Sequence, residues 1–308
     1  MAAPLSPPTT VTYRGRFAPS PTGPLHLGSL TTALASYLDA HAQNGTWLVR
    51  IEDIDPPREQ AGAATRILRS LEAHGLHWDE DILWQSRRTE AYLDALQHLK
   101  NRRTLFTCYC SRRQSDTEGN CGGHCRQRQP VNADTDTFAL RVVVAPHFTA
   151  HWSDRWQGVQ HWPIGQRVQD FIVCRRDGLF AYQLAVVVDD AAQRISQIVR
   201  GSDLLDSTAR QLWLQQQLGY TSPDYAHLPV LTDGNGQKLS KQNHAPALDD
   251  SQAMANLQVA LAYLGQQAPD PDTDNCNDVL HQAIANWQWQ HMPTGMSQQL
   301  AGQGTFTL

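Results

Sequence analysis

The stretch that decides the fold is RFAPSPTGPLHLGS at residues 16–29, where a short apolar segment runs into a turn rich in proline and glycine. A helical pattern of apolar residues follows from Leu30 to Ala42 and stops at Asn44-Gly45. The next segment, Trp47 to Ile51, is typical of a buried strand. A strand, a glycine-containing loop, a helix and a second strand in this order predict the start of a doubly wound α/β sheet of the Rossmann type.

The remaining segments continue this alternation. Helices are predicted at 60–74, 89–102 and 204–218, and short strands at 137–144, 171–174, 184–188 and 195–199. From residue 245 onward the pattern is helical and polar. We therefore expect an α/β protein with a Rossmann-type core at 12–105 and 180–245, an insertion at 106–179 and a small helical region at 246–308.

Composition places the chain among folded proteins without a membrane span. Of 308 residues, 41% are hydrophobic and 18% charged, which suffices for a core and argues against disorder. No apolar run approaches the roughly 18 residues that a span requires, and the N-terminus lacks a signal peptide pattern. We expect a cytoplasmic monomer with no membrane partner. The net charge of −5 argues at first against nucleic acid.

The tetrapeptide His26-Leu27-Gly28-Ser29 lies where the turn passes into the helix. The amides of a helix N-terminus favour an anion, Gly28 allows a ligand to approach the backbone, and an imidazole can donate to a phosphate. The alternative is an ordinary helix N-terminus with a solvated histidine, because such tetrapeptides are common.

A second tetrapeptide, Lys238-Leu239-Ser240-Lys241, follows the glycine-rich turn at 233–236. Two ammonium groups on a mobile loop can stabilise charge on a triphosphate. The alternative is a basic surface loop. However, the chain has only three lysines against 22 arginines, so two lysines at this spacing favour phosphate binding.

Together, RFAPSPTGPLHLGS at 16–29 and KLSKQ at 238–242 resemble the two signatures of class I aminoacyl-tRNA synthetases in their glutamyl and glutaminyl form. The resemblance spans Tyr13 to Asn243. It departs at Ser29, where the general signature has a second histidine, and at Gln242, where it has serine. It implies a Rossmann-type catalytic domain that uses ATP with Mg²⁺. His26 and Lys241 would act on the phosphates, Lys238 would support them, and Gly28 would contact ATP.

The resemblance also implies a pocket for L-glutamate. It is predicted to be lined by Arg16, Ala18, Ser20, Glu52, Tyr182 and Arg200. Arginines would hold carboxylate and Glu52 the ammonium. Arg16, Glu52 and Arg200 fall at predicted strand ends, where ligands of open α/β sheets collect. The alternative for each is a structural ion pair. Four further aspartates, Asp53, Asp55, Asp189 and Asp190, are assigned no chemistry and are expected to cap helices or pair with arginines.

Four of the six cysteines, Cys108, Cys110, Cys121 and Cys125, crowd into 18 residues. Their spacing predicts a structural Zn²⁺ site with four thiolate ligands, with Tyr109 and His124 as fallback ligands. The alternative is unrelated reduced cysteines. Bacterial glutamylating members of the family have a similar cysteine pattern, with a tyrosine at the position of Cys121. Between Lys100 and Arg128 there are seven basic residues and two acidic ones, which fits an RNA-contacting insertion; the alternative is a merely solvated basic face.

The 67 residues after Lys241 contain six aspartates and neither lysine nor arginine, so this segment is a poor anticodon reader. A catalytic core without an anticodon-binding domain resembles the truncated branch of the family. That branch activates L-glutamate with ATP and transfers it to the queuosine of tRNA(Asp). Three alternatives stay open: a truncated glutamyl-tRNA synthetase that charges the tRNA 3′ end, a synthetase-like ligase that activates an amino acid for a small-molecule amine, and a non-enzymatic zinc-stabilised RNA-binding module. Since the acidic tail carries −6 and residues 1–241 carry +1, the net charge does not exclude RNA.

Overall fold

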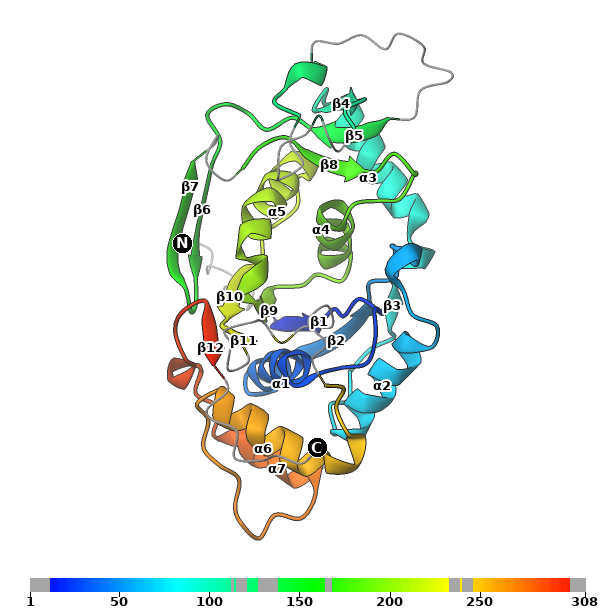
Figure 1. The fold of residues 1–308 in the computed structure, drawn as a ribbon. Helices are drawn as coiled ribbons and strands as arrows, with labels where there is room; N and C mark the ends of the chain where they lie inside the picture. The colour runs from blue at the N-terminus through cyan, green and yellow to red at the C-terminus, as the bar shows by residue number, and fades with distance from the viewer. Residues whose placement is uncertain are drawn as a thin grey trace, which may run out of the picture.

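The computed structural model describes residues 12–111, 114, 121–126, 138–163, 168–232, 239 and 246–299. Its centre is a parallel sheet. β1 (Arg14–Phe17), β2 (Thr46–Ile51) and β3 (Leu83–Trp84) pair in that order, and β9 (Gln197–Gly201) pairs with β10 (Asp224–Leu228). The two sets lie side by side (Figure 1), because the Ser196 amide donates to the Arg14 carbonyl at 3.0 Å. The order β3-β2-β1-β9-β10 is that of a Rossmann-type sheet, so the predicted fold class is confirmed.

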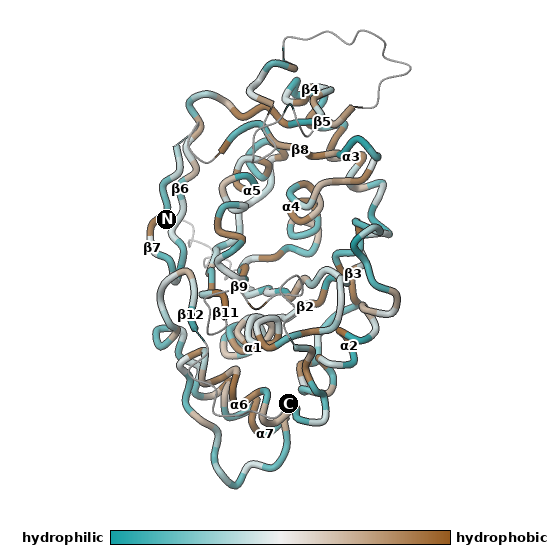
Figure 2. Tube along the Cα trace, in the orientation of Figure 1, coloured by the Kyte–Doolittle hydropathy of each residue, from teal (hydrophilic) through white to brown (hydrophobic). Residues whose placement is uncertain are grey.

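Helices cover both faces of this sheet (Figure 1). On one face lie α1 (Leu27–His41), α2 (Ala63–Ala73), α6 (Ala253–Tyr263) and α7 (Cys276–Ala285), whose apolar residues share one hydrophobic cluster. On the other lie α3 (Thr89–Asn101), α4 (Tyr182–Ala192) and α5 (Leu205–Leu218), which form a second cluster. The C-terminal helices are therefore part of the folded core. Figure 2 shows that the loop between them, at the bottom of the view, is hydrophilic.

Residues 105–174 add two pieces of antiparallel structure. β4 (Leu105–Cys108), β5 (Ala139–Val142) and β8 (Phe171–Cys174) form one small sheet. β6 (Thr149–Asp154) and β7 (Gly158–Pro163) form a hairpin that pairs with β10 through Tyr225 and Asp154, and so extends the central sheet. Further on, β11 (Val230–Thr232) pairs in parallel with β12 (Ser297–Gln299), which returns the chain to the core.

One predicted strand is wrong. The run Leu184 to Val188 is rich in valine, which favours a strand, but it lies inside helix α4. All its residues are buried, and Asp189 and Asp190 after them are buried too. A helix enclosed on nearly all sides has no polar face to reveal a 3.6-residue period, so its apolar run cannot be told from a buried strand.

Within the described part of the chain, no helix is both long enough and apolar enough to cross a membrane.

Candidate active site

A cavity of about 900 Å³ opens where β1, β2 and β9 end. Every predicted pocket and phosphate residue that the structure describes lines it, namely Arg16, Ala18, Ser20, His26, Gly28, Glu52, Tyr182 and Arg200. Their positions follow from the topology, because parallel strands bring their carboxyl ends to one edge and helix N-termini face the same edge. Lys238 and Lys241 lie outside the described residues.

In the predicted glutamate pocket, Arg16 forms an ion pair with a residue of the protein. Its Nε donates to Oδ1 of Asp190 at 3.0 Å, and Asp190 also accepts from Arg50 at 2.7 Å. All three side chains are buried. Burial alone would raise the pKa of Asp190, but the two guanidinium groups outweigh it and hold the pKa below its usual value. Asp190 thus pairs with arginines, as expected, and fixes Arg16 at the cavity wall.

Glu52 is the buried acid of the cavity, with 8% of its surface exposed. Its backbone amide donates to the Pro19 carbonyl at 3.0 Å, which holds the residue just beyond β2. Burial raises its pKa to about 7, although Arg50, 3.7 Å away, and Arg16 act in the opposite direction. A ligand that brings a positive charge to this carboxyl relieves the cost of ionising it.

Arg200 is held along one edge of its guanidinium group. Nε donates to Nε2 of His227 at 2.9 Å and NH2 donates to Thr208 Oγ1 at 2.8 Å, while NH1 lies 3.5 Å from the Tyr182 hydroxyl. The guanidinium carbon lies 5.3 Å from the ring centre of Tyr225. Arg200 is therefore fixed in position and presents its remaining nitrogen beside Tyr182, at the cavity.

The phosphate motif forms the N-terminus of α1. His26 is the N-cap, and its Nδ1 accepts from the Ser29 amide at 3.3 Å. The backbone at Gly28 is closely approached, since a Cβ there would lie 3.3 Å from the His26 ring and 3.6 Å from the Leu239 carbonyl oxygen. Leu239 itself donates to the Leu231 carbonyl at 2.7 Å. The described residue of the second motif thus packs directly over the first.

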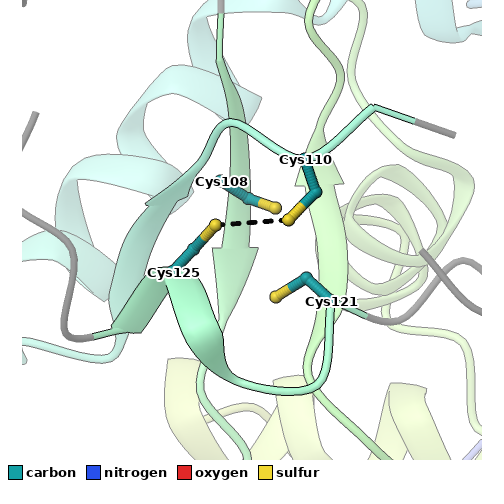
Figure 3. A group of neighbouring side chains, drawn as sticks. All are labelled: Cys108, Cys110, Cys121 and Cys125. Carbon is teal, nitrogen blue, oxygen red and sulfur yellow. Dashed lines mark hydrogen bonds between the residues drawn. The ribbon is translucent and has the colours of Figure 1, made fainter. Parts of the chain in front are cut away.

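The four clustered cysteines converge (Figure 3). All four Sγ atoms lie within 4.8 Å of one another, and Cys110 Sγ is 3.4 Å from Cys125 Sγ. Tetrahedral Zn²⁺ with bonds of about 2.3 Å would require sulfurs about 3.8 Å apart, so the group can hold a metal ion. Gly122 and Gly123 make the turn between the last two cysteines with φ of 58° and 77°, which only glycine adopts readily. Of the two fallback ligands, His124 lies outside this group.

Several further residues of the cavity and its support were assigned no role in the site by the sequence prediction, although Asp55 was expected to cap a helix or pair with arginines. Asp55 lines the cavity and pairs with Arg58 and Arg175, which also line it. His227 and Asp154 stand behind Arg200. A strand-end position was the available signal for Asp55, whereas His227 and Asp154 lie on strands without any motif.

The comparisons place the chain in a known class. The family model of class I tRNA synthetases (E and Q), catalytic domain, matches residues 12–262. The chain therefore belongs to the class I tRNA synthetases of the E and Q type and is a ligase, as the sequence resemblance predicted. A crystal structure of glutamate-tRNA synthetase from Elizabethkingia anophelis matches with a TM-score of 0.79 at 22% identity, over 94% of this chain and 68% of that one.

Within this class, several similar curated proteins share one name. The "Glutamyl-Q tRNA(Asp) synthetase" of Escherichia coli O157:H7 is 48% identical over 92% of this chain and 92% of its own. The protein of that name from Citrobacter koseri is 50% identical over 94% of this chain and 96% of its own. The one from Chromobacterium violaceum is 46% identical, with 92% and 96% covered.

Proposed function

We propose that this chain activates L-glutamate with ATP and transfers the glutamyl group to queuosine at the wobble position of tRNA(Asp). The observation that carries the activation step is one cavity lined by two buried guanidinium groups, Arg16 and Arg200, and one buried carboxyl, Glu52. A dicarboxylic amino acid offers two carboxylates and one ammonium, so its charges are complementary to this set. The names of the similar proteins support the acceptor.

In the activation step, an oxygen of the glutamate α-carboxylate attacks the α-phosphorus of ATP. The bond from that phosphorus to the bridging oxygen of the β-phosphate breaks, and pyrophosphate leaves with its electron pair. This step requires no nucleophilic side chain, so positioning and charge stabilisation supply the catalysis. We assign phosphate contacts to His26, the Gly28 backbone and Lys241, with Lys238 in support and Mg²⁺ accompanying ATP.

In the transfer step, a hydroxyl of the cyclopentene-diol ring of queuosine attacks the acyl carbon of the adenylate. The bond from that carbon to the phosphate oxygen breaks, AMP leaves, and the hydroxyl proton passes to solvent. Ala18, Ser20 and Tyr182 line the cavity beside the charged residues and are proposed to complete the glutamate pocket.

For the cysteine group we propose one structural Zn²⁺, held by Cys108, Cys110, Cys121 and Cys125. Four protein thiolates leave no coordination position for substrate, so the metal would stabilise fold rather than react. The domain division is proposed in the same sense, with a core at 12–105 and 180–245, an insertion at 106–179 and a helical region at 246–308.

Two assays test the proposal. Glutamate-dependent ATP–pyrophosphate exchange, run with and without tRNA, tests activation, and its absence in every condition would leave the RNA-binding alternative. Labelled glutamate is then offered to tRNA(Asp) with and without queuosine, and the labelled nucleoside is identified after nuclease digestion. We expect label on queuosine only, including in tRNA(Asp) trimmed of its terminal adenosine.

A second candidate, charging of the tRNA 3′ end, is favoured by the likeness in fold to glutamate-tRNA synthetase structures. The digestion experiment separates it directly. Label on the terminal adenosine, lost when the tRNA is trimmed, would establish this candidate and overturn transfer to queuosine.

A further inference from the structure

The Asp154–His227 pair is a buried acid–base pair with no part in the proposed chemistry. Asp154 ends β6 in the hairpin, and His227 lies on β10 of the central sheet. Asp154 Oδ2 lies 2.5 Å from His227 Nδ1, and both side chains are fully buried. Burying an ionisable pair carries a desolvation penalty that can exceed the attraction between the two groups. The contacts of this pair therefore indicate whether it has a role beyond stability.

The hydrogen bonds around Asp154 fix which ring nitrogen of His227 carries the proton. Oδ1 of Asp154 accepts from the backbone amides of Trp156, Gln157 and His227 at 3.0–3.1 Å. Asp154 is thereby held as a carboxylate with Oδ2 directed at Nδ1. Since a carboxylate can only accept, His227 must donate from Nδ1, which leaves Nε2 without a proton.

The unprotonated Nε2 of His227 accepts a hydrogen bond on the other side of the ring. Arg200 Nε, which can only donate, lies 2.9 Å from it, and Thr208 Oγ1 lies 3.2 Å from it. Burial and the Arg200 charge lower the pKa of His227 to about 4 despite Asp154, which agrees with an imidazole that stays neutral. A protonated Nε2 would face the Arg200 Nε–H donor to donor.

We propose that Asp154 and His227 are positioning residues for substrate binding: Asp154 fixes the tautomer of His227, whose Nε2 orients Arg200 toward the carboxylate of the amino-acid substrate. This inference rests on the proposed function for the identity of that substrate as glutamate. The relay connects the β6–β7 hairpin to the cavity through one side chain on each of three adjacent strands, β6, β10 and β9.

The decisive variant is Asp154→Asn, which has the same shape. The three backbone amides require an acceptor at the Oδ1 position, so the asparagine NH2 group must take the place of Oδ2 and donate to Nδ1. His227 then carries its proton on Nε2 and repels the Arg200 Nε–H. Losing one hydrogen bond to a charged group corresponds to a rise of about 10- to 100-fold in the KM for glutamate. We expect the KM for ATP to be unchanged and kcat to change by less than about threefold.

A structural role alone would not change the tautomer. Nitrogen-15 NMR of the histidine ring should show Nδ1–H in the wild type and Nε2–H in Asp154→Asn. A matched control is Tyr13→Phe, which removes a 2.5 Å hydrogen bond to a different buried aspartate, Asp39, without touching the cavity. We expect this control to be less stable and to keep the wild-type KM.

If Asp154→Asn does not fold, a second pair of variants gives the answer. In His227→Gln the amide can donate to Asp154 and accept from Arg200, so the KM for glutamate should stay within about threefold of the wild type. His227→Met removes both bonds and should raise it by about tenfold or more. Equal effects of the two variants would overturn the positioning role.

The two hypotheses fail in different ways. A folded Asp154→Asn with unchanged KM for glutamate, or with the proton still on Nδ1, overturns the positioning role and leaves the proposed function intact. A wild type without glutamate-dependent exchange overturns the proposed function. In that case the tautomer and the Arg200 Nε–H resonance, compared between wild type and variant, decide the positioning role.

Discussion

Glu52 is expected to destabilise the folded protein at the pH where it is proposed to bind the substrate. The perturbation that shows this is Glu52→Gln, which keeps the shape of the side chain and removes its charge. Arg50, the nearest cation, keeps its bonds to Asp190 at 2.7 Å and to Gln193 at 2.9 Å, so the substitution leaves no buried guanidinium without a partner. The stability change should therefore report mainly the charge of Glu52.

The magnitude follows from the pKa. Burial raises the pKa of Glu52 from its ordinary 4.5 to about 7, which corresponds to about 3 kcal/mol. Below about pH 4.5 the carboxyl is protonated in both the folded and the unfolded chain, and the variant should match the wild type. Between these values only the unfolded carboxyl ionises. Above about pH 7 the folded carboxyl must also ionise in its buried position, so the wild type carries the full cost.

The assay is urea denaturation of both proteins at about pH 4 and about pH 8. Glu52→Gln should be nearly equal to the wild type at the lower pH and more stable by up to about 3 kcal/mol at the higher. The same variant should lose glutamate-dependent exchange, because the ammonium loses its partner. A variant that is less stable than the wild type at about pH 8, or a difference that does not vary with pH, would refute the reasoning.

In the matched control, Glu80→Gln, the expected change in stability has the opposite sign. Glu80 pairs on the surface with Arg14 at 2.8 Å, and this hydrogen bond lowers the pKa of Glu80. A carboxyl whose pKa is lowered by folding stabilises the folded protein at pH values above its pKa in the unfolded chain. Glu80→Gln should therefore lose stability at about pH 8. Because the side chain is half exposed, the loss should stay below about 1 kcal/mol.

Three further predictions concern the rest of the molecule. Lys241→Ala should abolish adenylate formation in the exchange assay and leave the far-UV circular dichroism unchanged; unaltered exchange would remove Lys241 from its proposed role. Cys125→Ser should lose bound zinc by elemental analysis and lower the thermal midpoint, whereas Cys276→Ser, outside the cluster, should keep the metal. Trp287→Phe removes the 3.0 Å bond from Nε1 to Asp39 Oδ1 and should cost about 1 kcal/mol in urea denaturation, with exchange unaffected.

The predictable part of the site is the part defined by chain direction. A parallel sheet brings strand ends together, so Arg16, Glu52 and Arg200 could be placed at one edge from sequence alone, and all line the cavity. Cysteine spacing predicted a metal group for the same kind of reason, since short local segments cannot separate their sulfurs far. These features depend on topology and local geometry, which a sequence pattern expresses.

The part that sequence could not predict depends on contacts between distant segments. Arg16 meets Asp190, 174 positions away, and His227 meets Asp154, 73 positions away. Nothing in either segment indicates its partner, because a buried ion pair is set by how helix α4 and hairpin β6–β7 pack on the sheet. The strand predicted over α4 failed for a related reason: its valine-rich run reflects burial, and burial does not distinguish a helix from a strand.

The distribution of charge limits how the proposed tRNA can approach. All six aspartates after Lys241 are exposed, and the described residues of that segment include neither lysine nor arginine. The segment folds as α6 and α7 on the far side of α1 (Figure 1). Arg58 and Arg175, by contrast, line the cavity, and the Arg58 side chain is 68% exposed. Because phosphate contacts dominate RNA affinity, the backbone of an incoming anticodon loop should meet these arginines and avoid the acidic helices. We therefore expect tRNA to bind on the cavity side, where the proposed transfer requires the wobble base to enter.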